Sequence, residues 1–218
     1  MRRARSSRGG VDAAPREGLV LPGRELTGPA DWSRQFGRSA ELIVEIGFGK
    51  DPFLLDCAAA GPEGNHVGIE RDLGRAGRFL DEAHERGLTN VRALPITAEL
   101  ALGSCFVDGA ISELHVYFPD PWPKERHAEN RMVRPWFGQA VVRTLAGDGR
   151  LFMATDDAPY ANQIREVMAD AGLRLLASGH GRSDHETKFE RLWRSQGRHI
   201  QSMQFAPTSP VRETLNAS

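Results

Sequence analysis

The residues best suited to chemistry lie in one ten-residue segment, residues 118–127, with the sequence FPDPWPKERH. The segment carries a carboxylate, Asp120, a flat aromatic ring, Trp122, and three groups that can face a phosphate or a base, which are Lys124, Arg126 and His127. Its three prolines prevent a continuing strand or helix, because each proline fixes φ and lacks a backbone N–H donor. A plain turn needs one proline and no tryptophan. The composition therefore predicts a stiff loop that binds a ligand.

An alternation of strands and helices must position this loop. Apolar runs predict strands over Leu42–Ile46, 66–69, Val91–Leu94, 114–118, 151–154, 173–177, 188–193 and 199–205. Helical periodicity predicts helices over 52–60, 72–86, 134–145 and 159–171. We expect Asp51 to cap the first helix, with Pro52 in its first position, and Gly147 with Gly149 to end the third.

This pattern predicts an α/β fold with a doubly wound, mainly parallel sheet. No helix separates the last strands, so we expect a late antiparallel strand. Ligands of such sheets bind at the carboxyl ends of the strands. The proline-rich loop begins at such an end, which supports its interpretation as part of a site.

Composition is typical of a globular protein with one domain. The chain has 218 residues, of which 40% are hydrophobic and 26% are charged. We expect a flexible basic tail over residues 1–30 and a single domain over residues 31–218. No apolar run approaches the ~20 residues of a membrane span, and Cys57 and Cys105 lack the spacing of a metal site. The sequence thus predicts a cytoplasmic protein with reduced thiols, no membrane association and no metal.

Positive charge is clustered, although the formal net charge is only −1. A chain that coats nucleic acid would be strongly basic, so local patches would have to hold an RNA partner. One cluster is Lys124, Arg126, Arg131 and Arg134, a second is Lys188, Arg191, Arg194 and Arg198, and the first eight residues form a third. The first two clusters flank segments suited to chemistry, so we expect a local basic surface there.

A second candidate site follows the first predicted strand, in the segment EIGFG. Gly47 and Gly49 let the backbone turn tightly and approach a ligand. Glu70 ends the next strand, about 20 residues further on, where a carboxylate can hold ribose hydroxyls. Nicotinamide dinucleotides and S-adenosylmethionine both carry such a ribose. A dinucleotide motif needs a third glycine where Pro52 stands, and Asp51 would repel a pyrophosphate at the helix start. The residues favour S-adenosylmethionine, with an NAD-dependent oxidoreductase as an alternative.

The segment FPDPWPKERH resembles the signature of the bacterial tRNA (guanine-N7)-methyltransferases, which methylate a guanine in the tRNA variable loop. The resemblance covers about residues 41–205 and includes EIGFG at 45–49, GIE at 68–70, TD at 155–156 and TKFE at 187–190. It implies a Rossmann-like class I methyltransferase fold with a seven-stranded sheet, S-adenosylmethionine as the cofactor and tRNA as the partner. We expect a monomer or a weak homodimer.

The resemblance also implies roles for individual residues. Glu45 would lie beside the methionine end of the cofactor, Glu70 would hold the ribose, and Thr97 stands where the family has an aspartate near the adenine. The other cofactor residues that it implies are Gly47, Gly49 and Asp120. The substrate residues that it implies are Lys124, Asp156, Thr187, Lys188, Phe189 and Glu190. Taken alone, Asp156 is more typical of a helix cap, and residues 187–190 are more typical of an edge strand. The order of these segments along the chain, each at a predicted strand end or edge, favours the substrate role instead.

Guanine N7 has an in-plane lone pair and no proton to lose, so its methylation needs no strong general base. It needs alignment, and a negative charge near the imidazole ring as that ring becomes cationic. We expect Asp120 to supply this charge as the catalytic residue and Trp122 to shape the pocket. Asp51 and Thr97 depart from the family pattern. They leave a non-catalytic RNA-binding paralogue with a degenerate cofactor site as a further alternative.

Overall fold

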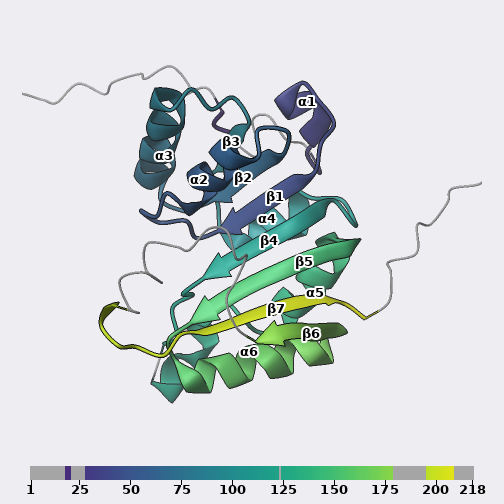
Figure 1. Ribbon diagram of the computed structural model, residues 1–218. Coiled ribbons are helices and arrows are strands. Elements are labelled where there is room, and N and C mark those ends of the chain that lie inside the picture. The colour runs from purple at the N-terminus through teal and green to yellow at the C-terminus, as the bar shows by residue number, and fades with distance from the viewer. Residues whose placement is uncertain (1–17, 21–27, 123, 179–194, 209–218) are drawn as a thin grey trace, which may run out of the picture.

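One mixed sheet of seven strands organises the chain (Figure 1). The computed structural model describes residues 18–20, 28–122, 124–178 and 195–208. The strands are β1 (Leu42–Ile46), β2 (Asn65–Ile69), β3 (Val91–Leu94), β4 (Ile111–Tyr117), β5 (Leu145–Thr155), β6 (Leu173–Ser178) and β7 (Gln201–Pro207), in the order β3-β2-β1-β4-β5-β7-β6. The strands from β3 to β5 pair in parallel, and β7 runs antiparallel to β5 and β6. The predicted sheet with its late antiparallel strand is confirmed.

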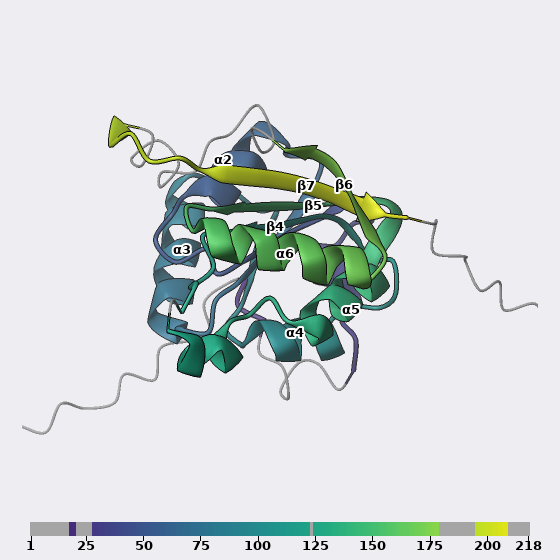
Figure 2. The same cartoon turned by 90° about the horizontal axis from the view of Figure 1, so that it is seen from below.

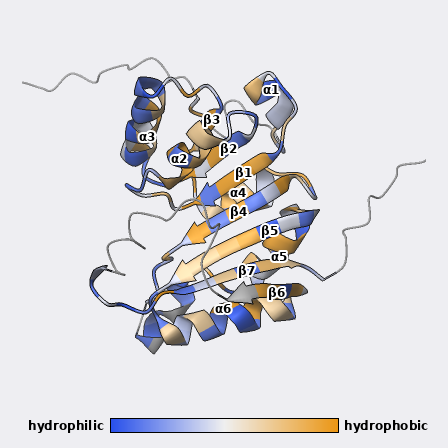
Figure 3. Cartoon of the chain, in the orientation of Figure 1, coloured by the Kyte–Doolittle hydropathy of each residue, from blue (hydrophilic) through white to orange (hydrophobic). Residues whose placement is uncertain are grey.

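Helices cover both faces of this sheet (Figure 2). They are α1 (Trp32–Phe36), α2 (Phe53–Ala60), α3 (Leu73–Glu85), α4 (Ala98–Ser104), α5 (Pro135–Thr144) and α6 (Ala158–Asp170). One apolar core, with Leu54 and Phe79, joins α2 and α3 to the sheet. The other, with Leu102 and Phe137, joins α4, α5 and α6 to the opposite face. The strand β1 is mostly apolar, whereas β4 mixes apolar and polar positions (Figure 3). Every residue of β1 and β2 is buried, as parallel strands under two helical layers require.

Several element boundaries differ from the sequence-based expectation. Helix α2 starts at Phe53, so Pro52 takes the cap position that was expected of Asp51. The Asp51 carboxylate nevertheless accepts the Phe53 N–H at 3.0 Å. Strand β5 begins at Leu145, directly after α5, instead of after two helix-ending glycines. A Cβ on Gly149 would lie 2.9 Å from the Ile111 carbonyl oxygen, so this glycine serves a close backbone approach to β4.

The sequence analysis did not predict the short helices α1 and α4. Neither is long enough to show a clear apolar periodicity, and both are recognisable mainly by their N-caps, Asp31 and Thr97. The last strand spans Gln201–Pro207 instead of 199–205. The strand expected over 188–193 lies outside the described residues. Most of the expected tail does too, although Leu19 pairs with Ala93 at the edge of β3.

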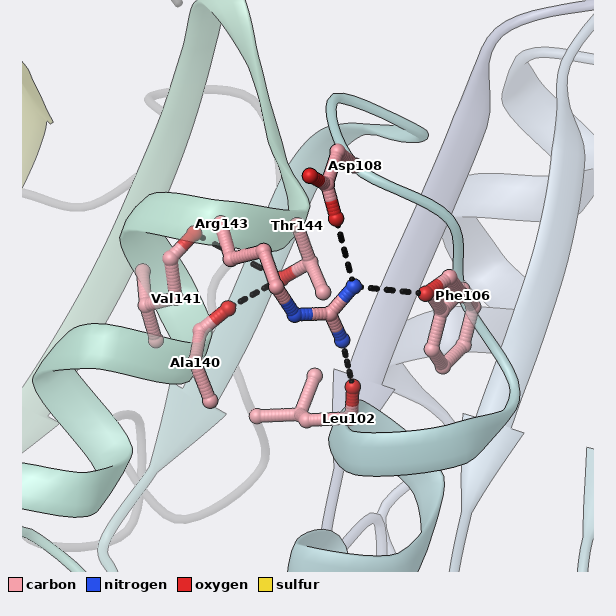
Figure 4. Close-up of polar contacts among 7 residues, drawn as sticks. All are labelled: Leu102, Phe106, Asp108, Ala140, Val141, Arg143 and Thr144. Atoms are coloured by element: carbon pink, nitrogen blue, oxygen red, sulfur yellow. Dashed lines mark hydrogen bonds and ion pairs between the residues drawn. The ribbon is translucent and has the colours of Figure 1, made fainter. Parts of the chain in front are cut away.

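Arg143 ties α5 to the connection between α4 and β4 (Figure 4). Its Nη1 donates to the Phe106 carbonyl at 3.0 Å and to the Asp108 carboxylate at 2.8 Å. Its Nη2 donates to the Leu102 carbonyl. One guanidinium thus satisfies the end of α4 and fixes the helical layer behind β4, the strand whose carboxyl end carries the proline-rich loop.

The contact between α5 and α6 yields a stability prediction. A Cβ on Gly138 of α5 would lie 2.7 Å from the Ala171 Cβ and 3.0 Å from the Val167 carbonyl oxygen. Gly138→Ala should therefore lower the free energy of unfolding by about 1–3 kcal/mol, the usual cost of overpacking. Gly103→Ala in α4 is the matched control, because no atom lies within 4 Å of its added Cβ. It should raise stability by up to about 1 kcal/mol. Urea unfolding checks both, and a Gly138→Ala protein as stable as wild type would contradict the packing.

Candidate active site

A cavity of about 490 Å³ opens at the carboxyl ends of β1, β2, β3 and β4. It brings together five residues that the sequence analysis nominated, which are Gly47, Gly49, Glu70, Thr97 and Asp120. A larger cavity of about 720 Å³ lies between α3 and β3 at the edge of the sheet, and it contains none of the nominated residues. The strand-end cavity is therefore the candidate site.

The turn after β1 presents bare backbone to this cavity. Gly47 and Gly49 have φ values of 76° and 57°, in the left-handed region that favours glycine. No atom lies within 4 Å of a Cβ built on Gly47. The Gly47 N–H donates to the Ile69 carbonyl at 2.7 Å, which fixes the turn against β2. A ligand can thus approach the peptide planes here without meeting a side chain.

Glu70 forms the wall of the cavity at the end of β2. One of its carboxylate oxygens accepts the Asp72 N–H at 3.0 Å, and the other lies 3.5 Å from Nη1 of Arg75. The residue is only 6% exposed, so the carboxylate is held in place by its neighbours. Each oxygen keeps a lone pair for a further donor, as two vicinal ribose hydroxyls would require.

Glu45 is a buried carboxylate with an unsatisfied oxygen. Its Oε2 has no hydrogen-bond partner among the described residues. Burial raises the pKa of Glu45 well above its ordinary value, and repulsion from Asp51 raises it further, whereas the Leu54 N–H lowers it. Glu45 is not among the residues that line the cavity, but it stands only two positions before Gly47, which does. A buried acceptor without a partner is costly, and a cationic ligand group would relieve that cost.

Thr97 lines the cavity and also caps α4. Its Oγ1 accepts the Leu100 N–H at 3.4 Å. The hydroxyl can still exchange one hydrogen bond with a ligand, but it brings no charge to this end of the cavity.

The loop that carries Asp120 has an unusual backbone. Phe118 and Trp122, with φ values of 50° and 39°, are the non-glycine residues of the described chain that lie in the left-handed region. The Phe118 N–H donates to the Ala154 carbonyl of β5 at 2.8 Å. The Asp120 carboxylate accepts the Trp122 N–H at 3.1 Å, which closes a turn around the carboxylate.

Arg131 clamps this loop from behind, although the sequence analysis grouped it with solvent-facing cations. Its Nε donates to the Pro121 carbonyl at 2.7 Å and its Nη2 to the Trp122 carbonyl at 3.2 Å. Its Nη1 donates to Oε1 of Gln163 in α6 at 2.6 Å. The guanidinium carbon lies 5.7 Å from the centre of the Tyr160 ring. The half-buried Arg131 therefore fixes the loop to α6 instead of forming part of a phosphate-binding surface.

The structure describes only some of the residues that the sequence analysis nominated for substrate binding. Asp156 forms an ion pair of 2.7 Å with Arg198, and the neighbouring Asp157 caps α6 by accepting the Tyr160 N–H. Capping is therefore not the role of Asp156. Lys124 is exposed, and neither it nor Asp156 lines the cavity. The other nominated residues, Thr187, Lys188, Phe189 and Glu190, lie outside the described residues.

The cavity also contains residues that the sequence analysis missed, among them Arg71, Arg75, Glu99, Tyr117, Asn130 and Met132. Arg71 directly follows Glu70, so its position at a strand end was a usable signal. Asn130 and Met132 reach the cavity because the chain folds back through a 3-10 helix over Glu125–Asn130, which nothing in the sequence pattern indicated.

Two negative observations concern the described part of the chain. It contains no group of three His, Cys, Asp or Glu side chains that could hold a metal ion. None of its helices is long and apolar enough to cross a bilayer.

Relatives with known names align with most of this chain. The model of a family described as "Putative methyltransferase" matches residues 39–203. A tRNA (guanine-N(7)-)-methyltransferase of Chromohalobacter salexigens is 42% identical over 169 residues, which are 77% of this chain and 67% of the relative. A protein of the same name from Pseudomonas syringae pv. syringae is 39% identical over 196 residues, which are 87% of this chain and 80% of the relative.

Solved structures share the fold at lower sequence identity. A 16S rRNA methyltransferase gives a TM-score of 0.61 at 18% identity, covering 86% of this chain and 98% of the other. An aminoglycoside resistance methyltransferase gives 0.59 at 17% identity, covering 81% and 91%. This likeness supports the Rossmann-like methyltransferase fold expected from the sequence. The family match and the identity to the named relatives show that the chain belongs to the tRNA (guanine-N(7)-)-methyltransferase family.

Proposed function

We propose that the protein transfers a methyl group from S-adenosylmethionine to N7 of a guanine in the variable loop of tRNA. The observation that carries this proposal is the single strand-end cavity that joins the glycine turn and Glu70 to Asp120 of the proline-rich loop. The names of the relatives support the substrate and the atom that is methylated.

The residues present fit the cofactor. The open turn at Gly47 leaves room for a ligand, Glu70 offers acceptors to a ribose, and the unsatisfied oxygen of Glu45 suits a cationic amino group. When bound, S-adenosylmethionine supplies an electrophilic methyl group. Gly49 and Thr97 border the remaining part of the cavity. The carboxylate of Asp51, which departs from the family pattern, accepts the Phe53 N–H at the start of α2.

Asp120 stabilises positive charge on the acceptor base. N7 of guanine attacks with its lone pair, and the imidazole ring becomes cationic as the new bond forms. A carboxylate that is already fixed beside the ring stabilises that charge without reorganising. The turn to Trp122 and the clamp by Arg131 hold Asp120 in this way. The loop thus provides alignment and charge, and no residue has to remove a proton.

Asp156 is the described residue best suited to read the Watson–Crick edge of the guanine. That edge presents the N1–H and N2–H donors, and a carboxylate accepts both. The ion pair with Arg198 then has to open when the base arrives. In this proposal Lys124 and residues 187–190 complete the nucleoside pocket.

The proposed activity is tested by mass spectrometry of nucleosides. Purified protein is incubated with S-adenosylmethionine and an unmodified tRNA transcript, and the digested product is analysed. The proposal expects 7-methylguanosine from the variable loop. A methyl group on another atom or another position, or no methylated nucleoside, would refute it. We further propose action in the cytoplasm, which agrees with the buried positions of Cys57 and Cys105, and a monomer or weak homodimer.

The charge of Asp120 can be separated from the shape of its loop. Asp120→Asn keeps an oxygen that accepts the Trp122 N–H but loses the negative charge. Methyl transfer should fall on the order of 10²-fold or more, the usual loss when one preorganised electrostatic group is removed. A tritiated-methyl assay under single-turnover conditions measures the loss, and thermal unfolding should be unchanged. A turnover close to wild type would remove Asp120 from the catalytic site.

Cofactor affinity should depend on pH through Glu45. In the free protein its raised pKa favours the protonated form, whereas an adjacent cationic amino group favours the carboxylate, so binding releases a proton. Affinity for S-adenosylhomocysteine should therefore rise with pH, by at most about tenfold per unit, from the ordinary pKa of a glutamate to the raised one. Calorimetric titration between about pH 5 and about pH 8 measures this dependence. Glu45→Gln should abolish it, and a pH-independent wild type would show that Glu45 does not meet the amino group.

Arg131 should act as a positioning residue. Arg131→Lys keeps the positive charge but cannot donate to the Pro121 and Trp122 carbonyls and to Gln163 together. We expect kcat to fall by about 10- to 100-fold because Asp120 is displaced, with S-adenosylhomocysteine affinity unchanged. Gln163→Leu removes the hydrogen bond between Arg131 and Gln163 from the α6 side, and it should also lower kcat. If both variants lowered only the melting temperature and left kcat intact, Arg131 would be merely structural.

A further inference from the structure

Four exposed cations gather beside the mouth of the cavity, and the sequence analysis did not single them out. Lys50 comes from the turn after β1, Arg71 precedes α3, and Arg75 and Arg78 lie in its first two turns. Arg71 and Arg75 line the strand-end cavity itself. Lys50, Arg75 and Arg78 line an adjoining hollow of about 160 Å³. We call these four residues the α3 patch.

Charges within α3 are unevenly distributed. Its arginines occupy the amino-terminal half, and the acidic residues Asp81, Glu82 and Glu85 lie in the carboxyl-terminal half. The Asp72 cap and the basic residues at the carboxyl end, His84 and Arg86, follow the order that the helix dipole favours, whereas the charges inside the helix do not. An anionic ligand at the amino end would stabilise the arginines that stand there.

Neighbouring carboxylates neutralise the α3 patch only in part. Glu70 pairs with Arg75, and the cap residue Asp72 lies close to Arg75 and Arg78, whose charges help to lower its pKa. Glu82 is paired with Arg86 outside the patch. Within the described part of the chain, Lys50, Arg71 and Arg78 form no salt bridge. Three exposed cations without a described salt bridge therefore stand at the mouth of the cavity, although the carboxylates of Asp51 and Glu82 also line the adjoining hollow.

We infer that the α3 patch binds backbone phosphates of the tRNA next to the guanine that enters the cavity, an inference that rests on the proposed function. Lysine and arginine contacts to phosphate supply position and affinity without reading sequence. A chain with a net charge of −1 cannot attract RNA over its whole surface, so a local patch has to do so. The patch adjoins the cofactor pocket, and it would guide the RNA toward the methyl donor.

The test is the double variant Lys50→Ala with Arg78→Ala, because neither side chain lines the cofactor cavity. Affinity for an unmodified tRNA transcript is measured by fluorescence at several salt concentrations, and S-adenosylhomocysteine affinity is measured by calorimetry. The double variant should bind tRNA more weakly. The slope of log affinity against log salt should become shallower by about 0.7–0.9 for each lost phosphate contact. Cofactor affinity should be unchanged.

The matched control also removes two positive charges, but from the amino ends of the parallel strands, away from the cavity. Arg34 in α1 and Arg174 at the start of β6 are both exposed. The helix α1 and the start of β6 lie at the amino ends of the parallel strands (Figure 1). Arg34→Ala with Arg174→Ala should keep the wild-type slope. If the wild type methylates tRNA and both double variants bind tRNA with its affinity and salt slope, the inference fails and the proposed function stands. If the wild type neither binds nor methylates tRNA, both fail.

Discussion

The left-handed backbone at Phe118 and Trp122 is the constraint on which the site depends. A non-glycine residue in this region costs of order 1–3 kcal/mol and persists only where its surroundings hold it. Here the holding contacts come from three directions: β5 through the Ala154 carbonyl, Asp120 through its own turn, and Arg131 through the loop carbonyls. These contacts hold the strained loop in one conformation and so fix the orientation of the Asp120 carboxylate. A reaction that needs no general base depends mainly on such a fixed charge.

The order of the strands explains why the site has two halves. β1 pairs with β2 on one side and with β4 on the other. The loops that follow β1 and β4 therefore lead to opposite sides of this point in the sheet and leave a crevice between them. Ligands of open α/β sheets bind at such a switch point. Gly47, Glu70 and Thr97 come from one half, and Asp120 comes from the other. In the proposed reaction the cofactor occupies the first half and the loop of Asp120 meets the acceptor base.

The sequence predicts those features that depend on local pattern. Apolar runs that alternate with helical segments predict the sheet, and the three prolines predict a stiff loop at the end of β4. Contacts between distant segments are not visible in the pattern. Arg131 resembles a solvent-facing cation in the sequence, because the carbonyls and Gln163 that it binds are brought to it only by folding. The role of Asp156 is similarly hidden, since either of two adjacent aspartates could cap α6 and the structure shows that Asp157 does.

A crystal structure of the protein with S-adenosylhomocysteine and a tRNA substrate would test the central claim most directly. The account predicts that Phe118 and Trp122 keep their positive φ values, that Arg131 keeps its contacts to the loop, and that the imidazole edge of the target guanine faces Asp120. A loop that relaxes to an extended backbone on binding, or a guanine bound away from Asp120, would contradict the claim that the protein catalyses transfer by presenting a preorganised carboxylate.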